Sequence, residues 1–355
     1  MTRYTVGILG ATGLVGQRLV ERLASHPWFA PSVLGASERS TGRPYGEVTR
    51  WMLSAAPPAE VAGRTVVPCV PEAFAGCDLV LSGLDARVAR EIEGAFAQAG
   101  HAVVSNSSAF RMEEDVPLLV PEVNAAHLAL LEGPRARGAG GFVVTNPNCS
   151  VTGLALALAP LHRAFGVRRV FVATMQALSG AGLEGPRGIE ALDNVIPFIA
   201  GEEEKIEREI GKILGRVEEG RVRPAPAVIS AHCHRVATLD GHLEAVSVEL
   251  EEPATPEQAV AALRAFRGET AGDALPSAPV TPIVVRDEPD RPQTRLDRDT
   301  LGGMAVVVGR VRRCPLTTLR CVVLSHNTVR GAAGGTLLNA ELLAARGLLR
   351  RRVPA

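Results

Sequence analysis

A cysteine in a polar turn is the first residue that could do chemistry. Cys149 lies in the stretch TNPNCS, residues 145–150, and residues Ser150–Ala164 have the composition of a helix. The positive end of a helix dipole favours the thiolate form of a cysteine and so makes its sulfur a nucleophile. On the turn alone, the alternative that Cys149 is a small core residue stays open.

A glycine loop near the start of the chain is a candidate cofactor site. Gly10, Gly13 and Gly16 stand between a strand expected at Tyr4–Leu9 and a helix expected at Leu14–Leu23. Without side chains, the loop lets the backbone approach a pyrophosphate, and the helix directs its first N–H groups at that anion. The pattern predicts dinucleotide binding, although a plain tight turn is the alternative. The expected contacts are Gly10, Thr12, Gly13, Leu14 and Val15.

The residues at the end of the next expected strand indicate whether NAD or NADP binds. An NAD enzyme places an acidic side chain there for the ribose hydroxyl. Here Glu38 is crowded by Ser37, Arg39 and Ser40. A guanidinium flanked by hydroxyls suits a 2′-phosphate, so we expect NADP(H) bound by Ser37, Arg39 and Ser40. The alternative is a solvated surface pair of Glu38 and Arg39.

A nucleophilic cysteine and a nicotinamide cofactor in one chain point to a specific chemistry. The thiol can form a thiohemiacetal with an aldehyde, which loses hydride to become a thioester, and the reverse sequence reduces a thioester. Neither group predicts this reaction without the other.

The elements that must position these groups alternate along the first 150 residues. Strands are expected at 31–36, 78–81 and 102–105, and residues 87–99 have a helical composition. Strands that alternate with helices predict a parallel, doubly wound sheet of Rossmann type.

After Cys149 the pattern changes. A strand is expected at Arg169–Met175, and Ala245–Leu250 and Met304–Val311 suggest a mixed or antiparallel sheet with one solvated face. Residues 335–349 predict a helix that could pack back on the first domain. We therefore expect an α/β chain with an NADP-binding domain at 1–148, completed by 327–355. A second, catalytic domain of α+β class with a mixed sheet is expected at 149–326.

Composition excludes several classes of function. The 355 residues carry 38 basic and 38 acidic side chains, so general binding to nucleic acid or to anionic membranes is not expected. No apolar run approaches the roughly 18 residues of a membrane span, and the N-terminal residues lack the pattern of a secretory signal. The six cysteines form no C-x-x-C pair, which favours neither disulfides nor a structural metal site. We expect a cytoplasmic protein without a bound metal, whose partner is a small-molecule substrate.

Five motifs follow one another along the chain. They are Gly10-Ala11-Thr12-Gly13-Leu14-Val15-Gly16, Ser37-Glu38-Arg39-Ser40, Ser105-Asn106-Ser107-Ser108-Ala109-Phe110-Arg111, Asn146-Pro147-Asn148-Cys149-Ser150 and Leu324-Ser325-His326-Asn327-Thr328-Val329-Arg330-Gly331-Ala332-Ala333-Gly334. Together they resemble the aspartate-β-semialdehyde dehydrogenase family in its archaeal and fungal branch. The resemblance extends from about Val6 to about Ala345, which is nearly the whole chain.

The resemblance implies the NADPH-dependent reductive dephosphorylation of β-aspartyl phosphate to aspartate semialdehyde and phosphate. This is a step toward lysine, threonine and methionine. Cys149 would attack the acyl phosphate, expel phosphate, and hold a thioester that takes hydride from C4 of the nicotinamide. A homodimer built through the sheet of the second domain is implied, and dimers could pair into a homotetramer.

The resemblance also assigns the other site residues. His242 would be the acid/base partner of the thiol, and an unperturbed pKa of about 6.5 suits that role. His232 and His234 are competing candidates. Arg235 would hold the α-carboxylate of the substrate and Glu202 its ammonium group. The remaining implied roles are phosphate binding by Lys205 and Arg111, placement of the acyl group by Gln176, substrate contact by Asn148, approach of Ser179 and Gly180 to the cofactor, and a place near the nicotinamide for Asn327. On the residue pattern alone, Glu202 and Lys205 read as the charged first turn of a helix.

The spacing of Arg235 and His242 predicts how their strands connect. Asp240-Gly241 is typical of a tight hairpin, which would leave the two residues on one face about 13 Å apart at a rise of about 3.3 Å per residue. That distance is too long unless the arginine side chain reaches back, so we expect a wider connection.

Three alternative functions stay open. Malonyl-CoA reductase uses the same thioester chemistry, but its substrate has no ammonium group, and an unpaired buried Glu202 would cost several kcal/mol. N-acetyl-γ-glutamyl-phosphate reductase would not need the carboxylate either, because its substrate nitrogen is acylated. The third alternative is a dinucleotide-binding regulator that has lost the reaction.

Overall fold

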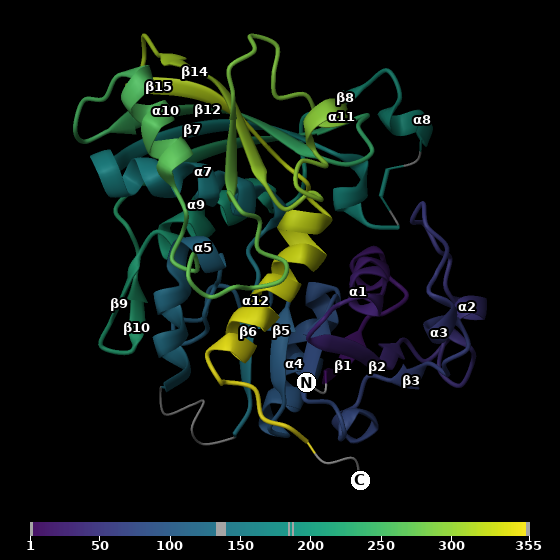
Figure 1. The fold of residues 1–355 in the computed structure, drawn as a ribbon. Helices are drawn as coiled ribbons and strands as arrows, with labels where there is room; N and C mark the ends of the chain where they lie inside the picture. The colour runs from purple at the N-terminus through teal and green to yellow at the C-terminus, as the bar shows by residue number, and fades with distance from the viewer. Residues whose placement is uncertain (1–2, 133–139, 184, 187, 353–355) are drawn as a thin grey trace.

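The structure is a computed structural model, and it describes residues 3–132, 140–183, 185–186 and 188–352 of the 355-residue chain. Figure 1 shows two lobes, each built around one sheet. The first lobe contains the N-terminal strand together with helix α12 from the end of the chain, and the second contains the middle of the chain.

The first lobe contains a parallel sheet of six strands in the order β3-β2-β1-β4-β5-β6. The strand order runs away from β1 in both directions, so the expected doubly wound sheet is confirmed. Because all strands are parallel, their carboxyl ends meet at one edge, where β1 and β4 are neighbours. The strands are β1 (Tyr4–Leu9), β2 (Phe29–Ala36), β3 (Val67–Pro68), β4 (Leu79–Ser82), β5 (Ala102–Ser105) and β6 (Phe142–Thr145).

Amphipathic helices cover this sheet. In α1 (Leu14–Ala24), Leu19, Val20 and Leu23 are buried and share a core with β1. Their spacing places them on one helix face, which explains why this segment folds against the sheet. The other helices of the lobe are α2 (Tyr45–Val48), α3 (Ala59–Ala62), α4 (Ala86–Gln98) and α5 (Pro121–Asn124).

The second lobe contains a mixed sheet of seven strands in the order β13-β14-β15-β12-β7-β11-β8. The pairs β7–β11 and β13–β14 are parallel and the others are antiparallel. Burial alternates along β12, as expected for a sheet with one covered face. The strands are β7 (Val167–Gln176), β8 (Val195–Ile196), β11 (Val228–Val236), β12 (His242–Leu250), β13 (Ile283–Arg286), β14 (Val306–Arg313) and β15 (Leu319–Ser325), and a separate hairpin is formed by β9 (Arg216–Glu218) and β10 (Arg221–Arg223).

Helix α7 (Cys149–Phe165) packs against the covered face of this sheet. Its residues from Ser150 to Leu161 are all buried, so the helix lies in the core of the lobe rather than on its surface. Helix α9 (Glu202–Ile213) packs beside it and against β11. The other α-helices that the structure describes in this lobe are α8 (Gly188–Ala191), α10 (Pro256–Ala265) and α11 (Thr294–Asp297).

Helix α12 (Gly334–Ala345) returns the chain to the first lobe. Its residues Leu337, Ala340 and Leu343 join the core that contains β1. Figure 1 shows this helix running down from the second lobe toward β5 and β6. The helix ends before the expected residue 349, and Gly347, just beyond it, has a φ of +68° that a continuing helix does not allow.

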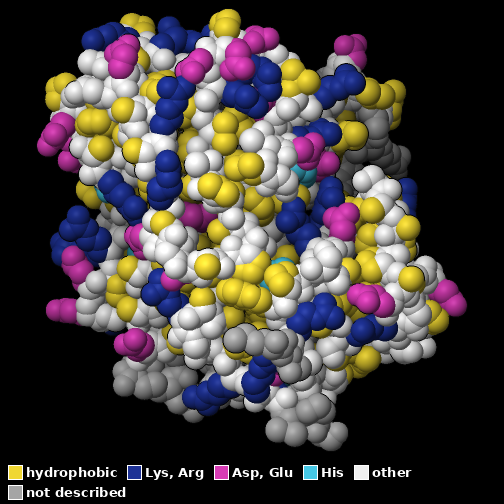
Figure 2. Space-filling view, in the orientation of Figure 1, with side chains coloured by type: hydrophobic (Ala, Val, Ile, Leu, Met, Phe, Trp, Pro, Cys, Tyr) yellow, Lys and Arg dark blue, Asp and Glu magenta, His cyan; other side chains and the backbone are white. Residues whose placement is uncertain are grey.

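No helix in the described part of the chain is long and apolar enough to cross a membrane. On the face drawn in Figure 2, basic and acidic side chains are interspersed, which agrees with the equal numbers of the two charges.

Candidate active site

Cys149 is the first residue of α7, directly after the capping residue of that helix. The side-chain oxygen of Asn148 accepts from the Ser150 amide at 2.9 Å and from the Val151 amide at 3.4 Å, which fixes the turn. Gly331 packs against the cysteine, where a Cβ would lie 2.9 Å from Cys149 Cβ. The Asn148 cap and the Gly331 contact therefore together fix the position of Cys149 at the start of the helix.

His242 is the histidine that meets the thiol. Its Nε2 lies 3.2 Å from Cys149 Sγ, and its Nδ1 accepts from the Ala177 amide at 3.0 Å. Because a backbone N–H can only donate, the neutral imidazole carries its proton on Nε2, directed at the sulfur. His232 and His234 occupy β11 positions beside buried Cys233, His232 is exposed, and His234 contacts the Thr174 carbonyl.

Burial shifts the pKa of both reactive groups. Burial, followed by the negative charge of Glu202, raises the pKa of Cys149 to about 12, although the charges of Arg111 and Arg235 oppose the shift. Burial, helped by the charge of Arg235, lowers the pKa of His242 to about 3. The expectations of a dipole-stabilised thiolate and of an imidazole pKa near 6.5 are therefore wrong. Desolvation is the largest cause of both shifts, because each group is packed away from water.

Three expected residues lie side by side at the ends of three neighbouring strands. Arg235 on β11 pairs with Gln176 on β7, and Leu243 on β12 pairs with Met175, which places His242 beside Gln176. All three polar side chains are buried. Strand β7 thus separates Arg235 from His242, and the connection is wider than a hairpin, as expected.

Glu202 is the polar centre of the site. Its Oε1 accepts from Lys205 Nζ at 2.8 Å, and its Oε2 accepts from Asn148 Nδ2 at 2.8 Å and Gln176 Nε2 at 3.3 Å. Burial alone would raise the pKa of Glu202, but these partners, above all the Lys205 charge, hold the pKa below its usual value. The carboxylate is therefore paired without a substrate ammonium. Contrary to expectation, a malonyl substrate would not leave Glu202 unpaired, because Lys205 on the same helix neutralises the carboxylate.

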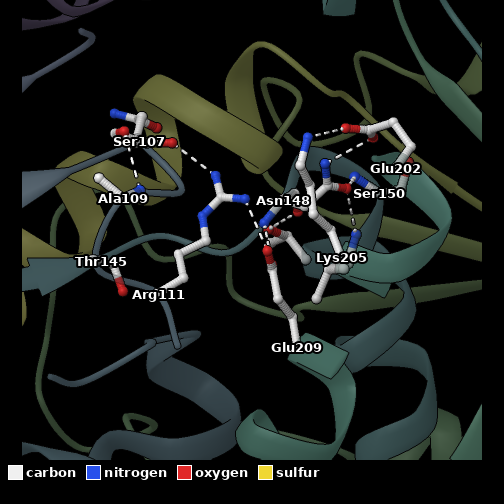
Figure 3. Close-up of polar contacts among 12 residues, drawn as sticks. Ser107, Ala109, Arg111, Thr145, Asn148, Ser150, Glu202, Lys205 and Glu209 are labelled. Carbon is white, nitrogen blue, oxygen red and sulfur yellow. Dashed lines mark hydrogen bonds and ion pairs between the residues drawn. The ribbon is translucent and has the colours of Figure 1, made fainter. Parts of the chain in front are cut away.

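Arg111 reaches the site from the loop after β5. Its Nη1 donates to Glu209 Oε1 at 2.9 Å and its Nη2 donates to the Asn106 carbonyl at 2.7 Å. Figure 3 shows Arg111 and Asn148 both directed at Glu209, with Lys205 and Glu202 beside them. Sequence reasoning missed Glu209, although it lies seven residues after Glu202, a spacing that places both on one face of α9.

A cavity of about 610 Å³ joins the expected cofactor and substrate residues. Gln176, Arg235 and His242 are not among its lining residues. A Cβ on Gly180 would lie 3.0 Å from Arg235 Nη1 and from His242 Cε1, so Gly180 packs directly on both side chains. The expected residues that line the cavity are Gly13, Leu14, Val15, Arg111, Asn148, Cys149, Ser179, Gly180, Glu202, Lys205 and Asn327.

The glycine loop has the shape that a pyrophosphate requires. Gly10 has a φ of +73°, and a Cβ on Gly16 would lie 2.2 Å from the Gly10 carbonyl oxygen. Helix α1 begins at Leu14, and Gly13, its N-cap residue, has no side chain that could accept from the first amides of the helix. Gly13, Leu14 and Val15 line the cavity, so this helix N-terminus is available to an anion bound there. Asn327 also lines the cavity, where it donates to Ser179 Oγ at 2.8 Å and accepts from the Gly241 amide at 2.8 Å.

The three residues expected at the 2′-phosphate lie in one turn after β2. The Ser40 amide donates to the Ser37 carbonyl at 2.9 Å, and Arg39 is exposed. Because β1 and β2 are parallel neighbours, this turn shares the sheet edge of the glycine loop, although it does not line the cavity. Among the described residues, no group of three or more His, Cys, Asp or Glu side chains could hold a metal ion.

Comparison with known families matches both halves of the chain. Residues 5–131 match the semialdehyde dehydrogenase NAD-binding domain, and residues 158–330 match the semialdehyde dehydrogenase dimerisation domain. Aspartate-semialdehyde dehydrogenase of Methanothermobacter thermautotrophicus is 51% identical over 95% of this chain and 98% of that protein. The Schizosaccharomyces pombe enzyme of the same name is 45% identical over 97% of this chain and 98% of that protein.

Solved structures agree with this assignment. The crystal structure of aspartate-semialdehyde dehydrogenase with NADP from Candida albicans has a TM-score of 0.91 and 42% identity, over 98% of this chain and all of that chain. Aspartate-semialdehyde dehydrogenase II from Vibrio cholerae, solved in complex with its ligand ASA, has a TM-score of 0.76 and 28% identity, over 97% of this chain and 99% of that chain. The cysteine and histidine contact, the cavity and these full-length matches agree, and the chain belongs to the aspartate-semialdehyde dehydrogenase family.

Proposed function

We propose that this protein catalyses the NADPH-dependent reductive dephosphorylation of β-aspartyl phosphate to aspartate semialdehyde, in lysine, threonine and methionine biosynthesis. The observation that carries the proposal is the 3.2 Å contact of Cys149 Sγ with His242 Nε2, beside a cavity that also reaches the glycine loop and Lys205. A thiol nucleophile, a dinucleotide loop and substrate-binding charges in one cavity suit acyl-phosphate reduction. Relatives of the same name in archaea and fungi support the assignment.

Cys149 would act as the nucleophile. Its sulfur attacks the acyl carbon, the carbon–oxygen bond to phosphate breaks, and the acyl group remains on the sulfur as a thioester. The thiol proton leaves as the bond forms, and the departing phosphate is a base that can carry it. His242 would hold a proton at Nε2 for the substrate oxygen that becomes an alkoxide during reduction. Gln176, beside it, would position the acyl group.

Charged side chains would orient the substrate. Arg235 would grip the α-carboxylate, and Glu202, oriented by Asn148, would accept the ammonium group. Lys205 and Arg111 line the same cavity and would bind the phosphate. Lys205 and Glu202 pair with each other in the absence of substrate. When the substrate binds, its ammonium group would replace Lys205 beside Glu202, and its phosphate would replace Glu202 beside Lys205.

NADP(H) fits the other end of the cavity. Bound there, it supplies the hydride for reduction of the thioester. The pyrophosphate would lie over Gly10, Gly13 and the first amides of α1, which Thr12, Leu14 and Val15 surround. Ser37, Arg39 and Ser40 would bind the 2′-phosphate. Ser179, Gly180 and Asn327 would contact the nicotinamide half.

The chain organisation supports a two-domain enzyme. We place the cofactor domain at 1–148 with 327–355 and the catalytic domain at 149–326. The match to a dimerisation domain at 158–330 supports a homodimer, and a homotetramer of paired dimers is the alternative. All six cysteines are free thiols, which suits a reducing cytoplasm.

The test is phosphate-dependent reduction of NADP by the purified protein with aspartate semialdehyde. We expect turnover that falls by several orders of magnitude in Cys149→Ser and persists in the matched variant Cys77→Ser, which changes a thiol buried in the first lobe. Absence of turnover in the unmodified protein would exclude the proposed reaction.

Malonyl-CoA reduction is the second candidate, because Glu202 is already neutralised by Lys205 and would tolerate a substrate without an ammonium group. Oxidation of NADPH with malonyl-CoA, in the absence of aspartate semialdehyde turnover, would favour this reaction. Absence of turnover in both assays would favour a dinucleotide-binding regulator.

A further inference from the structure

Helix α9 directs four charged side chains toward the site instead of toward solvent. Glu202, Lys205, Glu209 and Lys212 follow one another at spacings of three, four and three residues, which places them on one face of the helix. Glu202, Glu209 and Lys212 are all at most 7% exposed. Glu202 and Lys205 belong to the proposed substrate site, so the two residues further along the helix need a separate explanation.

Glu209 connects two parts of the site with one carboxylate. Its Oε1 accepts from Arg111 Nη1 at 2.9 Å, and its Oε2 accepts from the Asn148 backbone amide at 2.7 Å (Figure 3). Arg111 comes from a loop of the first lobe, whereas Asn148 caps the helix that begins with Cys149. The carboxylate therefore sets the position of a phosphate-binding guanidinium relative to the nucleophile.

Lys212 holds the same loop one helical turn further along. Its ammonium group donates to the carbonyl oxygens of Arg111 at 2.7 Å, Glu113 at 2.6 Å and Val116 at 2.8 Å. Burial lowers the pKa of Lys212 to about 8, although nearby carboxylates, chiefly those of Asp115 and Glu113, act in the opposite direction. The loop is thus held at its backbone by Lys212 and at its guanidinium by Glu209.

We propose that Glu209 is a positioning residue for phosphate binding, which holds the Arg111 guanidinium in register with the Cys149 helix. This inference rests on the proposed function, because that function assigns Arg111 to phosphate. The positioning role predicts the opposite effect on phosphate binding from the one expected from charge alone. A carboxylate beside Arg111 competes with phosphate for the guanidinium, so by charge alone its removal would tighten phosphate binding.

Glu209→Gln separates the two explanations. Arg111 and the Asn148 amide are both donors, but an amide side chain offers one oxygen, so one donor would face an NH₂ group. If position matters, the KM for phosphate rises about 10- to 100-fold, the effect of losing one hydrogen bond to a charged group. The KM for NADP should stay unchanged, because Glu209 bonds to Arg111 and to the Asn148 amide and not to the glycine loop. A phosphate KM that falls or stays constant would overturn the proposal.

Two further variants complete the test. Glu204→Gln removes the same charge from an exposed position of the same helix and should leave all constants unchanged. Glu209→Asp keeps both oxygens on a shorter side chain, and we expect a phosphate KM between those of the unmodified protein and Glu209→Gln. If Glu209→Gln does not fold, a folded Glu209→Asp with an unchanged phosphate KM would overturn the proposal.

Arg111→Lys distinguishes failure of this inference from failure of the proposed function. An inactive unmodified protein would exclude the reaction itself. An active protein in which Arg111→Lys leaves the phosphate KM unchanged would remove Arg111 from the phosphate site and with it the role of Glu209. A raised phosphate KM in Arg111→Lys but not in Glu209→Gln would reject only the positioning role.

Discussion

Arg235 and His242 contact the backbone of the same residue, Ala177. Arg235 Nη1 donates to the Ala177 carbonyl at 2.7 Å, and the Ala177 amide donates to His242 Nδ1 at 3.0 Å. Ala177 directly follows β7, the strand that separates the two residues. The backbone of one residue therefore fixes both the direction of the guanidinium, through its carbonyl, and the tautomer of the imidazole, through its amide.

Gly180→Ala tests this arrangement. The added Cβ would lie 3.0 Å from both Arg235 Nη1 and His242 Cε1. We expect kcat to fall about 10- to 100-fold from misplacement of these groups, with the thermal midpoint of unfolding nearly unchanged. Gly63→Ala, where a Cβ would have no neighbour within 4 Å, is the matched control. Unchanged kinetics in Gly180→Ala would show that neither side chain needs its present position.

Asn148→Asp tests the pairing of the cap with Glu202. Aspartate keeps the capping oxygen but places a carboxylate where Asn148 Nδ2 donates to Glu202 at 2.8 Å. Asn148→Ser keeps a cap without the repulsion and should cost about 1 kcal/mol or less in free energy of unfolding. We expect a larger loss for Asn148→Asp at pH 7.5 that shrinks as the pH falls, because the repulsion raises one carboxyl pKa and protonation removes it. Equal stability of the two variants at pH 7.5 would contradict this prediction.

Alkylation with iodoacetamide tests the protonation state of Cys149. Because burial raises its pKa to about 12, its thiolate fraction and its labelling rate should rise about tenfold per pH unit from pH 7 to 9. Cys314 should react first at pH 7, because hydrogen bonds from Thr317 and neighbouring amides outweigh burial and lower its pKa to about 7. Peptide mass spectrometry resolves the two sites. If the labelling rate of Cys149 does not change with pH above pH 7, the thiol is already ionised at pH 7, and the hypothesis of a dipole-stabilised thiolate would be supported instead.

His101 should link stability to pH. Burial, helped by the charge of Arg352, lowers the pKa of His101 to about 4, below the value of about 6.5 expected in the unfolded chain. The unfolded chain therefore binds the proton first, so this contribution to stability is complete above pH 6.5 and is lost as the pH falls toward 4. Denaturant unfolding should show that the unmodified protein loses up to about 1.4 kcal/mol per pH unit relative to His101→Gln in this range. Parallel stability curves for the two proteins would contradict the prediction.

The fold class and the candidate nucleophile could be predicted from local sequence signals, whereas His242 and the substrate-binding charges were assigned through the family resemblance. The strand at Tyr4–Leu9, the glycine loop and the helix after it are adjacent in the chain, so their periodicity and spacing are visible without any long-range contact. The same holds for Cys149 at the start of a helix. The Leu- and Ala-rich composition of residues 335–349 predicts a helix that could pack on the first lobe, and α12 does so.

Protonation and pairing depended on tertiary structure. The sequence places Cys149 at the positive end of a helix, yet the pKa of its thiol rises because residues distant in the chain exclude water from it. Arg235 and His242 are seven residues apart, but only the insertion of β7 between their strands brings both to Ala177. Glu209 was not expected because its two partners belong to distant segments. The chain itself determined which groups could react, whereas the packed sheets decided their charge, their partners and their direction, because desolvation and hydrogen bonding act between residues that only folding brings together.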